Sequence, residues 1–228
     1  MQAVDFALGR FLSEVYPIDN AAEGAKNWCR FMARPPAQKI MRGDFETASD
    51  IIRSMEASQK QASQNNKIKW NSVSLPVIAY GRKPNIIVSD PDAGSYSQKT
   101  VISENDFRLK LIQVDIEYRI AMLAWDIPTL DQMQMQWMFH VAFEQSKIEY
   151  QVKVDGEPMT LTADIIDPKT PAFEDSSLPA SDGRVHAVLL PIRARTYLAK
   201  GMLVDIPDPI RIHFSGGPLE RAWPRDGN

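Results

Sequence analysis

The stretch IQVDIEYRIAML, residues 112–123, decides the fold class of this chain. Apolar side chains occupy every second position from Ile112 to Met122, and the positions between them are mostly polar or charged. Successive side chains of a strand point to opposite faces of a sheet, so an alternation of this length predicts one long strand. One face of that strand is expected to lie on a core and the other to be mostly exposed to water.

A helix is predicted to follow this strand and to begin at Thr129. Gln132 stands three positions later, which is the spacing of a capping box, and an apolar stripe with helical periodicity runs on to residue 142. Met135 and Trp137 lie too far apart around this helix to point at one sheet. One of the two is therefore expected to face a neighbouring subunit. Trp125, between the strand and the helix, is a further interface candidate.

A β-hairpin is predicted after the helix. Asp155-Gly156 is a strong two-residue turn signal, and an alternating apolar run lies on each side of it. In the register that this turn imposes, Val152 faces Met159. Tyr150 then faces Leu161, so the apolar faces of the two strands agree, as a stable cross-strand pairing requires.

The first third of the chain has the pattern of helices. They are predicted over residues 4–15 and 21–34, and from an N-cap at Asp44 onward. The apolar stripe of the third helix fades after Met55, so its later part is expected either to be exposed or to rest on another subunit. From Trp70 onward the pattern changes to that of strands.

Further strands and loops complete the expected order. Strands are predicted over residues 72–80, 185–198 (bent near Pro191) and 210–214, and long loops over 84–100 (with a small strand at 86–88) and 167–183. This order predicts an α+β fold, in which N-terminal helices precede a mainly antiparallel sheet with one helix packed on it. The expected regions are a helical region (1–69), a sheet domain (70–215) and an extended tail (216–228).

Composition and charge exclude several classes of protein. The 228 residues include 26 basic and 29 acidic side chains, a formal charge of −3, whereas nucleic-acid binding relies on concentrated basic charge. Cys29 is the single cysteine, so no intrachain disulfide can form. Neither a signal peptide nor the about 18 consecutive apolar residues of a membrane helix is present. We expect a soluble protein that is made in a reducing cytoplasm and binds neither membranes nor specific nucleic-acid sequences.

The sequence contains no recognisable catalytic, cofactor or metal motif. Phosphate-binding glycine loops and nucleophile elbows are missing, and the three histidines are far apart in the chain: His140, His186 and His213. Asp115 and Glu117 share one face of the long strand with Arg119, which is typical of an exposed ladder of charges. We therefore expect a non-enzymatic protein without cofactor or metal. The alternative is a small enzyme in which His140, His186 and a carboxylate converge only in space.

Arg193 and Arg195 lie on one face of the strand predicted over residues 185–198. That strand is expected to be an outer one, on which the two arginines form a solvated edge that discourages aggregation. The functional alternative is charged docking onto a partner ring. Both arginines are therefore interface candidates.

Three stretches give the chain its resemblance to a known family. They are SLPVIAY at residues 74–80, VDIEYRIAM at 114–122 leading into DQMQMQWMF at 131–139, and RVHAVLLPIRARTYL at 184–198. Together they resemble the early strand, the long strand with its helix, and the late strand of the tail-terminator, or proximal sheath-stabilising, proteins of contractile-tailed bacteriophages. The resemblance spans residues 73–198.

This resemblance implies a structural role in the virion. The protein would form a homo-oligomeric ring, expected to be a hexamer, on the last ring of the tail tube. There it would stop polymerisation, hold the end of the sheath and receive the neck. The loops at 84–105 and 167–183 would reach these partners, which makes Tyr96 and Phe173 interface candidates. A baseplate or sheath-initiating subunit with a similar sheet is the alternative.

Overall fold

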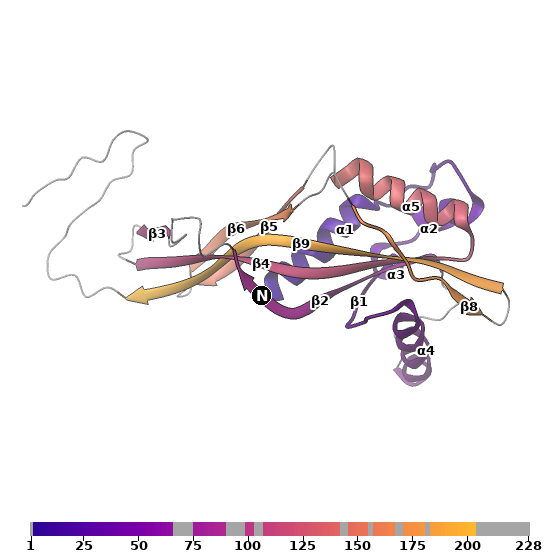
Figure 1. Cartoon of the computed structure of the whole chain (residues 1–228), viewed down its shortest axis with the longest axis horizontal. Coiled ribbons are helices and arrows are strands. Elements are labelled where there is room, and N and C mark those ends of the chain that lie inside the picture. The colour runs from indigo at the N-terminus through magenta and orange to yellow at the C-terminus, as the bar shows by residue number, and fades with distance from the viewer. Residues whose placement is uncertain are drawn as a thin grey trace, which may run out of the picture.

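The computed structural model describes residues 2–65, 75–89, 99–102, 107–141, 146–154, 157–166, 171–180 and 183–203 (Figure 1). Its helices are α1 (Gln2–Val15), α2 (Lys26–Met32), α3 (Pro36–Lys39), α4 (Ala48–Asn65) and α5 (Ile127–Phe139). Its strands are β1 (Ile40–Arg42), β2 (Val77–Val88), β3 (Lys99–Ile102), β4 (Phe107–Ala124), β5 (Lys147–Val154), β6 (Glu157–Ile166), β7 (Glu174–Asp175), β8 (Leu178–Ala180) and β9 (Gly183–Leu203). The predicted α+β fold class is confirmed.

One curled sheet organises the molecule. Its strands follow the order β1-β2-β4-β9-β6-β5, and every pair is antiparallel except β1 with β2. β4 and β9 pair over their whole common length, from Phe107 opposite Leu203 to Ala124 opposite His186. One end of this long pair projects beyond the helices (Figure 1). The alternation in residues 112–123 is thus the middle of a central strand.

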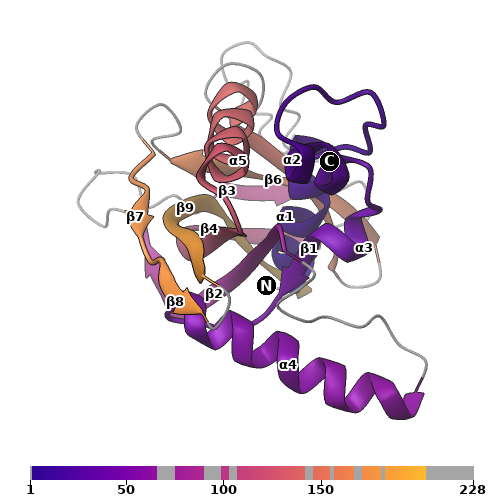
Figure 2. The same cartoon turned by 90° about the vertical axis from the view of Figure 1, so that its right-hand side faces the viewer.

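α1 lies inside the curl of the sheet. It packs against both end strands, β1 and β5, and its apolar residues share the larger core with β2, β4, β6 and β9. Figure 2 shows α1, α2 and α5 on the same side of the sheet and α4 on the other. The apolar side chains that α1 buries repeat at helical spacing, as a core-facing stripe does: Val4, Ala7, Leu8, Phe11, Leu12 and Val15. The first helix and the sheet therefore depend on one shared core.

A second, smaller core covers the opposite face of the sheet. Phe45, just before α4, and Ile51 and Met55 of α4 pack there against Ala121 and Leu123 of β4. The expectation that this face of the long strand is mostly exposed is therefore wrong at its C-terminal end. The sheet also carries helices on both faces, whereas one helix had been expected on it.

The two helix starts that were predicted from sequence lie elsewhere. α4 begins after Thr47, whose backbone N–H donates to the carboxylate of Asp50, so Asp44 is not its N-cap. α5 begins after Asp126, whose carboxylate accepts from the backbone N–H of Thr129 at 2.9 Å. Thr129 is therefore the third residue of that helix. In both cases the aspartate satisfies N–H groups that the helix itself leaves unpaired.

The hairpin is confirmed in register, with Val152 opposite Met159 and Tyr150 opposite Leu161. Other boundaries differ from prediction. α2 is shorter than the helix expected over 21–34, and α3 and β1 were not expected. The small strand predicted at 86–88 is confirmed as the end of β2. Three further strands in or next to the predicted loops were not expected: β3, which pairs with β4, and β7 and β8, which pair with β9. The strand predicted over 210–214 and the tail at 216–228 lie outside the described residues.

Lys39 is a buried lysine that joins the ends of two helices. Its ammonium donates to the carbonyl oxygens of Tyr16 (3.2 Å), Pro17 (2.7 Å) and Met32 (2.8 Å), at the C-terminal ends of α1 and α2. These carbonyls are the negative end of each helix dipole. Burial, with a further contribution from the charge of Arg34, lowers the pKa of Lys39 to about 8.

The lowered pKa of Lys39 predicts a pH dependence of stability. The pKa of Lys39 is 10.5 in the unfolded chain and about 8 in the folded chain. Between these pH values the unfolded chain binds more protons than the folded chain, so the free energy of unfolding rises with pH. Relative to Lys39→Met, the wild type is expected to gain up to about 1.4 kcal/mol per pH unit in this window. Urea unfolding at pH 7, 8, 9 and 10 measures the difference. A constant difference across this range would contradict the shift, and Lys153→Met, on an exposed lysine, is the control.

Candidate assembly surface

The end of β2, residues Ile86–Val88, forms an open edge of the sheet. β1 pairs only with Ile78–Tyr80, and no other described strand pairs with Ile86–Val88 on the side away from β4. Just before it, Lys83–Asn85 stand opposite the single residue Glu117, an irregularity that includes Pro84. Proline has no N–H for a ladder bond and is typical of such bulges and edges.

The hydrogen-bond pattern shows which groups this edge presents. The N–H of Ser89 donates to the carbonyl of Gln113, so Ser89 and Gln113 are a hydrogen-bonded pair. Such pairs alternate along an antiparallel ladder, so Ile87 also uses its N–H and C=O toward β4. The N–H and C=O groups of Ile86 and Val88 therefore point away from the sheet. They are a template for one further strand.

The side chains of this edge are apolar and exposed. Ile86, Ile87 and Val88 are 43%, 47% and 54% exposed. Ile87 lies on the face of Asp115, and its two neighbours lie on the opposite face, because side chains alternate along a strand. Three β-branched residues with exposed side chains and open backbone groups are the combination that invites pairing with another chain.

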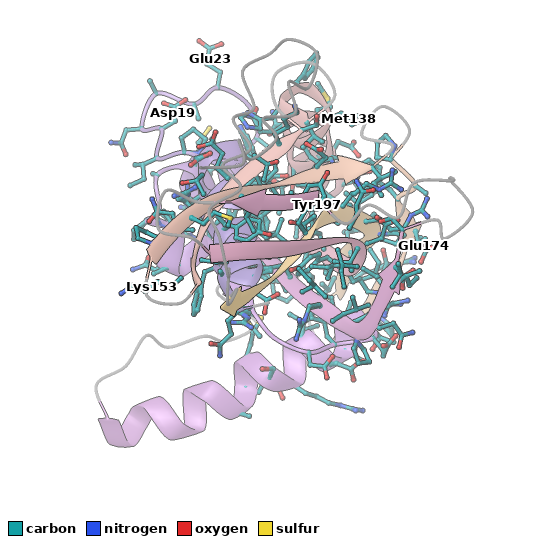
Figure 3. The ribbon with its side chains drawn as sticks, turned by 90° about the vertical axis from the view of Figure 1, so that its left-hand side faces the viewer. Asp19, Glu23, Met138, Lys153, Glu174 and Tyr197 are labelled. Carbon is teal, nitrogen blue, oxygen red and sulfur yellow. The ribbon has the colours of Figure 1, made fainter. Side chains whose placement is uncertain are left out.

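The opposite end of the sheet is protected. The carbonyl of Glu149 in β5 accepts a hydrogen bond from the guanidinium of Arg10 in α1, at 2.7 Å. Exposed Lys147 and Lys153 add charge at the two ends of the same strand (Figure 3 labels Lys153). A covering helix and lysines are common means of blunting an edge strand. Of β2 and β5, β2 is therefore the strand whose edge can pair with a strand of another chain.

An ion pair supports the sheet directly behind the β2 edge. Asp115 of β4 accepts from Nε of Arg195 in β9 (2.9 Å) and from the hydroxyl of Ser89 (2.7 Å). Burial raises the pKa of Asp115, but the hydrogen bonds from Arg195 and Ser89 outweigh it and hold the pKa below its ordinary value. The carboxylate is thus charged at neutral pH and joins three neighbouring segments of the sheet.

The charges on this face correct two expectations. Arg193 and Arg195 do not lie on an outer strand, because β9 stands between β4 and β6. Nor are Asp115, Glu117 and Arg119 an exposed ladder among themselves. Asp115 is buried, and each of the three bonds to another segment: Asp115 to Arg195, Glu117 to Lys83 and Arg119 to Glu46.

The predicted aromatic and methionine candidates occupy different environments. Trp137 is buried in the larger core (1% exposed), whereas Met135 on the same helix is 48% exposed. Trp125 is half-buried against the smaller core, and Phe173 is half-buried against the larger one. Tyr96 lies outside the described residues. Of the pair on α5, Met135 is therefore the side chain that is available to a neighbour.

The outer face of α5 is a second apolar surface. Ile127, Met135 and Phe139 are all exposed and follow one another at spacings of eight and four residues, with Asp131 between the first two. Positions four apart on a helix lie on one face. This stripe of residues 127, 131, 135 and 139 is called the α5 face below.

A partly open pocket of about 340 Å³ is lined by residues of β4, α5, β6 and β9. Trp137 and Ile192 are among the apolar residues that line it, together with the charged side chains Lys83, Glu117 and Arg193. The described lining residues include no histidine, cysteine or serine. Within the described part of the chain, no three His, Cys, Asp or Glu side chains form a group that could hold a metal ion. His140 instead contacts the ring of Phe11, 5.5 Å between centroids.

The small strand predicted at 86–88 is confirmed as the end of β2, and its run of three β-branched residues is the sequence signal for it. The sequence did not predict that this strand lies at an exposed edge of the sheet, because its place in the sheet depends on residues far along the chain. Comparison of the chain with protein-family models and with curated proteins gives no match to either. No helix in the described residues is long and apolar enough to span a membrane.

Proposed function

We propose that this protein is a structural, ring-forming subunit of the tail-terminator type in a contractile-tailed bacteriophage. In this role it caps the tail tube, holds the end of the sheath and receives the neck. The observation that carries the proposal is the open apolar edge at Ile86–Val88, on a rigid sheet whose other end strand is protected. Such an edge suits joining to another subunit by strand addition.

Two further features support an assembly role. The α5 face exposes Ile127, Met135 and Phe139, apolar side chains of the kind that oligomer interfaces bury. The resemblance to terminators over residues 73–198 includes β2 and α5, the elements that carry the two surfaces. A ring requires head-to-tail contacts between two different surfaces of each subunit. The β2 edge and the α5 face are two such surfaces.

A capping experiment tests the proposal. Tail tubes are polymerised from the tube protein of the same phage, the purified protein is added, and the products are imaged by negative-stain electron microscopy. We expect ring-shaped density at one end of each tube and no elongation of that end when more tube protein is supplied. Met135→Glu is expected to reduce capping, because it puts a charge into an apolar contact.

Two results would overturn the proposal. One is tubes that carry no added density and elongate as before, although circular dichroism shows the protein to be folded. The other is density only at the baseplate end of the tube, which would assign the protein to the initiating end.

A further inference from the structure

We propose that, in the free protein, the β2 edge pairs with the same edge of a second copy around a two-fold axis centred on Ile87. The two copies would then share one continuous sheet through antiparallel β2 strands. The contact follows from the strand geometry alone. Only its role as a resting form, described below, rests on the proposed function.

The backbone pattern of the edge is self-complementary. Ile86 and Val88 present outward N–H and C=O groups two residues apart, so Ile86 of one copy can exchange two hydrogen bonds with Val88 of the other. The two-fold axis repeats the exchange and gives four bonds in all. Between them the two Ile87 residues form the non-hydrogen-bonded pair, whose Cα atoms stand about 4.5 Å apart. The three cross-strand side-chain pairs that residues 86–88 form in this register are all apolar.

The side chains of the edge fit a second copy in this antiparallel arrangement. Ile86 of one copy stands beside Val88 of the other on one face of the sheet, and the two Ile87 side chains meet on the other face. All three side chains are exposed in the single chain, so each pair removes apolar surface from water.

Such a dimer is a resting form in the proposed function. A two-fold contact joins the same patch of both copies. In a head-to-tail ring each contact joins two different surfaces, so the two-fold contact cannot be one of the ring contacts. Dimer and ring contact through the β2 edge would therefore exclude each other. The short contact belongs to the small, weak interfaces below about 1,200 Å², which can give way when a tail end is available. Until then, self-pairing protects an edge that would otherwise aggregate.

A charge-swap experiment tests the pairing. Ile87→Lys and Ile87→Glu each place like charges opposite one another at the axis, so each variant alone is expected to be a monomer of 25.7 kDa. Mixed in equal amounts, they are expected to form a heterodimer of twice that mass, because the introduced ammonium of one copy then faces the introduced carboxylate of the other. Sedimentation velocity across a concentration series measures the mass. The wild type is expected to dimerise over the same series, as is Ile18→Lys, a control on an exposed isoleucine outside the edge.

Hydrogen exchange gives a second readout that a different interface would not reproduce. On dimerisation the hydrogen-exchange rates of the backbone amides of Ile86 and Val88 are expected to fall at least tenfold. The amide of Ile87, already bonded to β4, should not change. A mixture of the two Ile87 variants that stays monomeric, or unchanged exchange at Ile86 and Val88 in a wild-type dimer, would overturn the pairing. Neither result affects tube capping, so this inference and the proposed function fail separately.

Discussion

Asp5→Ala is expected to lower the free energy of unfolding by about 3 kcal/mol, because it leaves the buried hydroxyl of Tyr118 without its acceptor and the half-buried guanidinium groups of Arg42 and Arg82 without their charge partner. Asp5 is buried on α1, and its carboxylate accepts hydrogen bonds from Arg42 of β1 (2.6 Å) and from the hydroxyl of Tyr118 in β4 (2.8 Å). The guanidinium of Arg82 in β2 lies 3.8 Å away. One side chain thus connects the inserted helix to three strands.

Tyr118→Phe is expected to lower the free energy of unfolding by a smaller amount than Asp5→Ala. It removes one hydrogen bond to Asp5 and no charge, so we expect a loss of about 1.5–3 kcal/mol. Burial, the hydrogen bond to Asp5 and the charge of Asp5 together raise the pKa of Tyr118 far above its ordinary value, so its hydroxyl stays protonated. Urea unfolding monitored by circular dichroism measures both variants. The control is Asp131→Ala, on an exposed carboxylate, with a change within about 0.5 kcal/mol.

A double-mutant cycle decides whether the two residues act together. If Asp5 and Tyr118 stabilise the fold through their mutual bond, the double variant loses less than the sum of the single losses. Strict additivity would show that Asp5 acts through Arg42 and Arg82 alone. A loss below about 1 kcal/mol for Asp5→Ala would mean that the helix is held in the curl by apolar packing, without a contribution from this network.

Features that depend on neighbouring residues were predictable from the sequence. The alternation at 112–123 predicts β4, because burial of one face requires an apolar residue at every second position. Asp155-Gly156 fixes the hairpin register, since a two-residue turn leaves a single way to pair the flanking strands. In both cases the cause of the structure lies within the segment itself.

Features that depend on distant residues were not predictable. Arg195 was predicted to be on an outer strand, but β9 is a central strand because it pairs with β4 on one side and with β6 on the other. The ionic partner of Arg195, Asp115, lies 80 residues earlier in the chain. In the same way, the stripe of α1 predicts a helix but not that it lies inside the curl. There Asp5 bonds to Tyr118, 113 residues later. Periodicity indicates which face of an element is buried, and only the assembled fold indicates what buries it.

The candidate site was predictable in part. Met135 and Trp137 could be separated by helical geometry into one inward and one outward residue, although geometry alone does not decide which is which. The decisive factor is the position of Phe11 on α1, whose ring meets that of Trp137 at 6.2 Å in an edge-on contact. Because Phe11 and the sheet residues of the larger core lie on the same side of α5, Trp137 is directed inward, and Met135 then faces outward.

Substitution of Trp137 is expected to have a large effect on the free energy of unfolding, and substitution of Met135 a small one. Trp137→Ala is expected to cost about 3–5 kcal/mol, because it removes a fully buried indole from the larger core and leaves a cavity. Met135→Ala, two positions away on the same helix, is expected to change the unfolding free energy by less than about 0.5 kcal/mol, because its side chain is exposed. Urea unfolding of the two variants side by side measures the contrast.

The same pair separates stability from assembly. If the α5 face is a ring contact, Met135→Ala reduces capping of tail tubes while the protein unfolds at the wild-type urea concentration. Trp137→Ala reduces capping only as far as it reduces the folded population, and a stabilising osmolyte such as trimethylamine N-oxide then restores it. A Met135→Ala variant that caps normally would remove the α5 face from the ring contact. The β2 edge would then be the sole remaining candidate among the described surfaces.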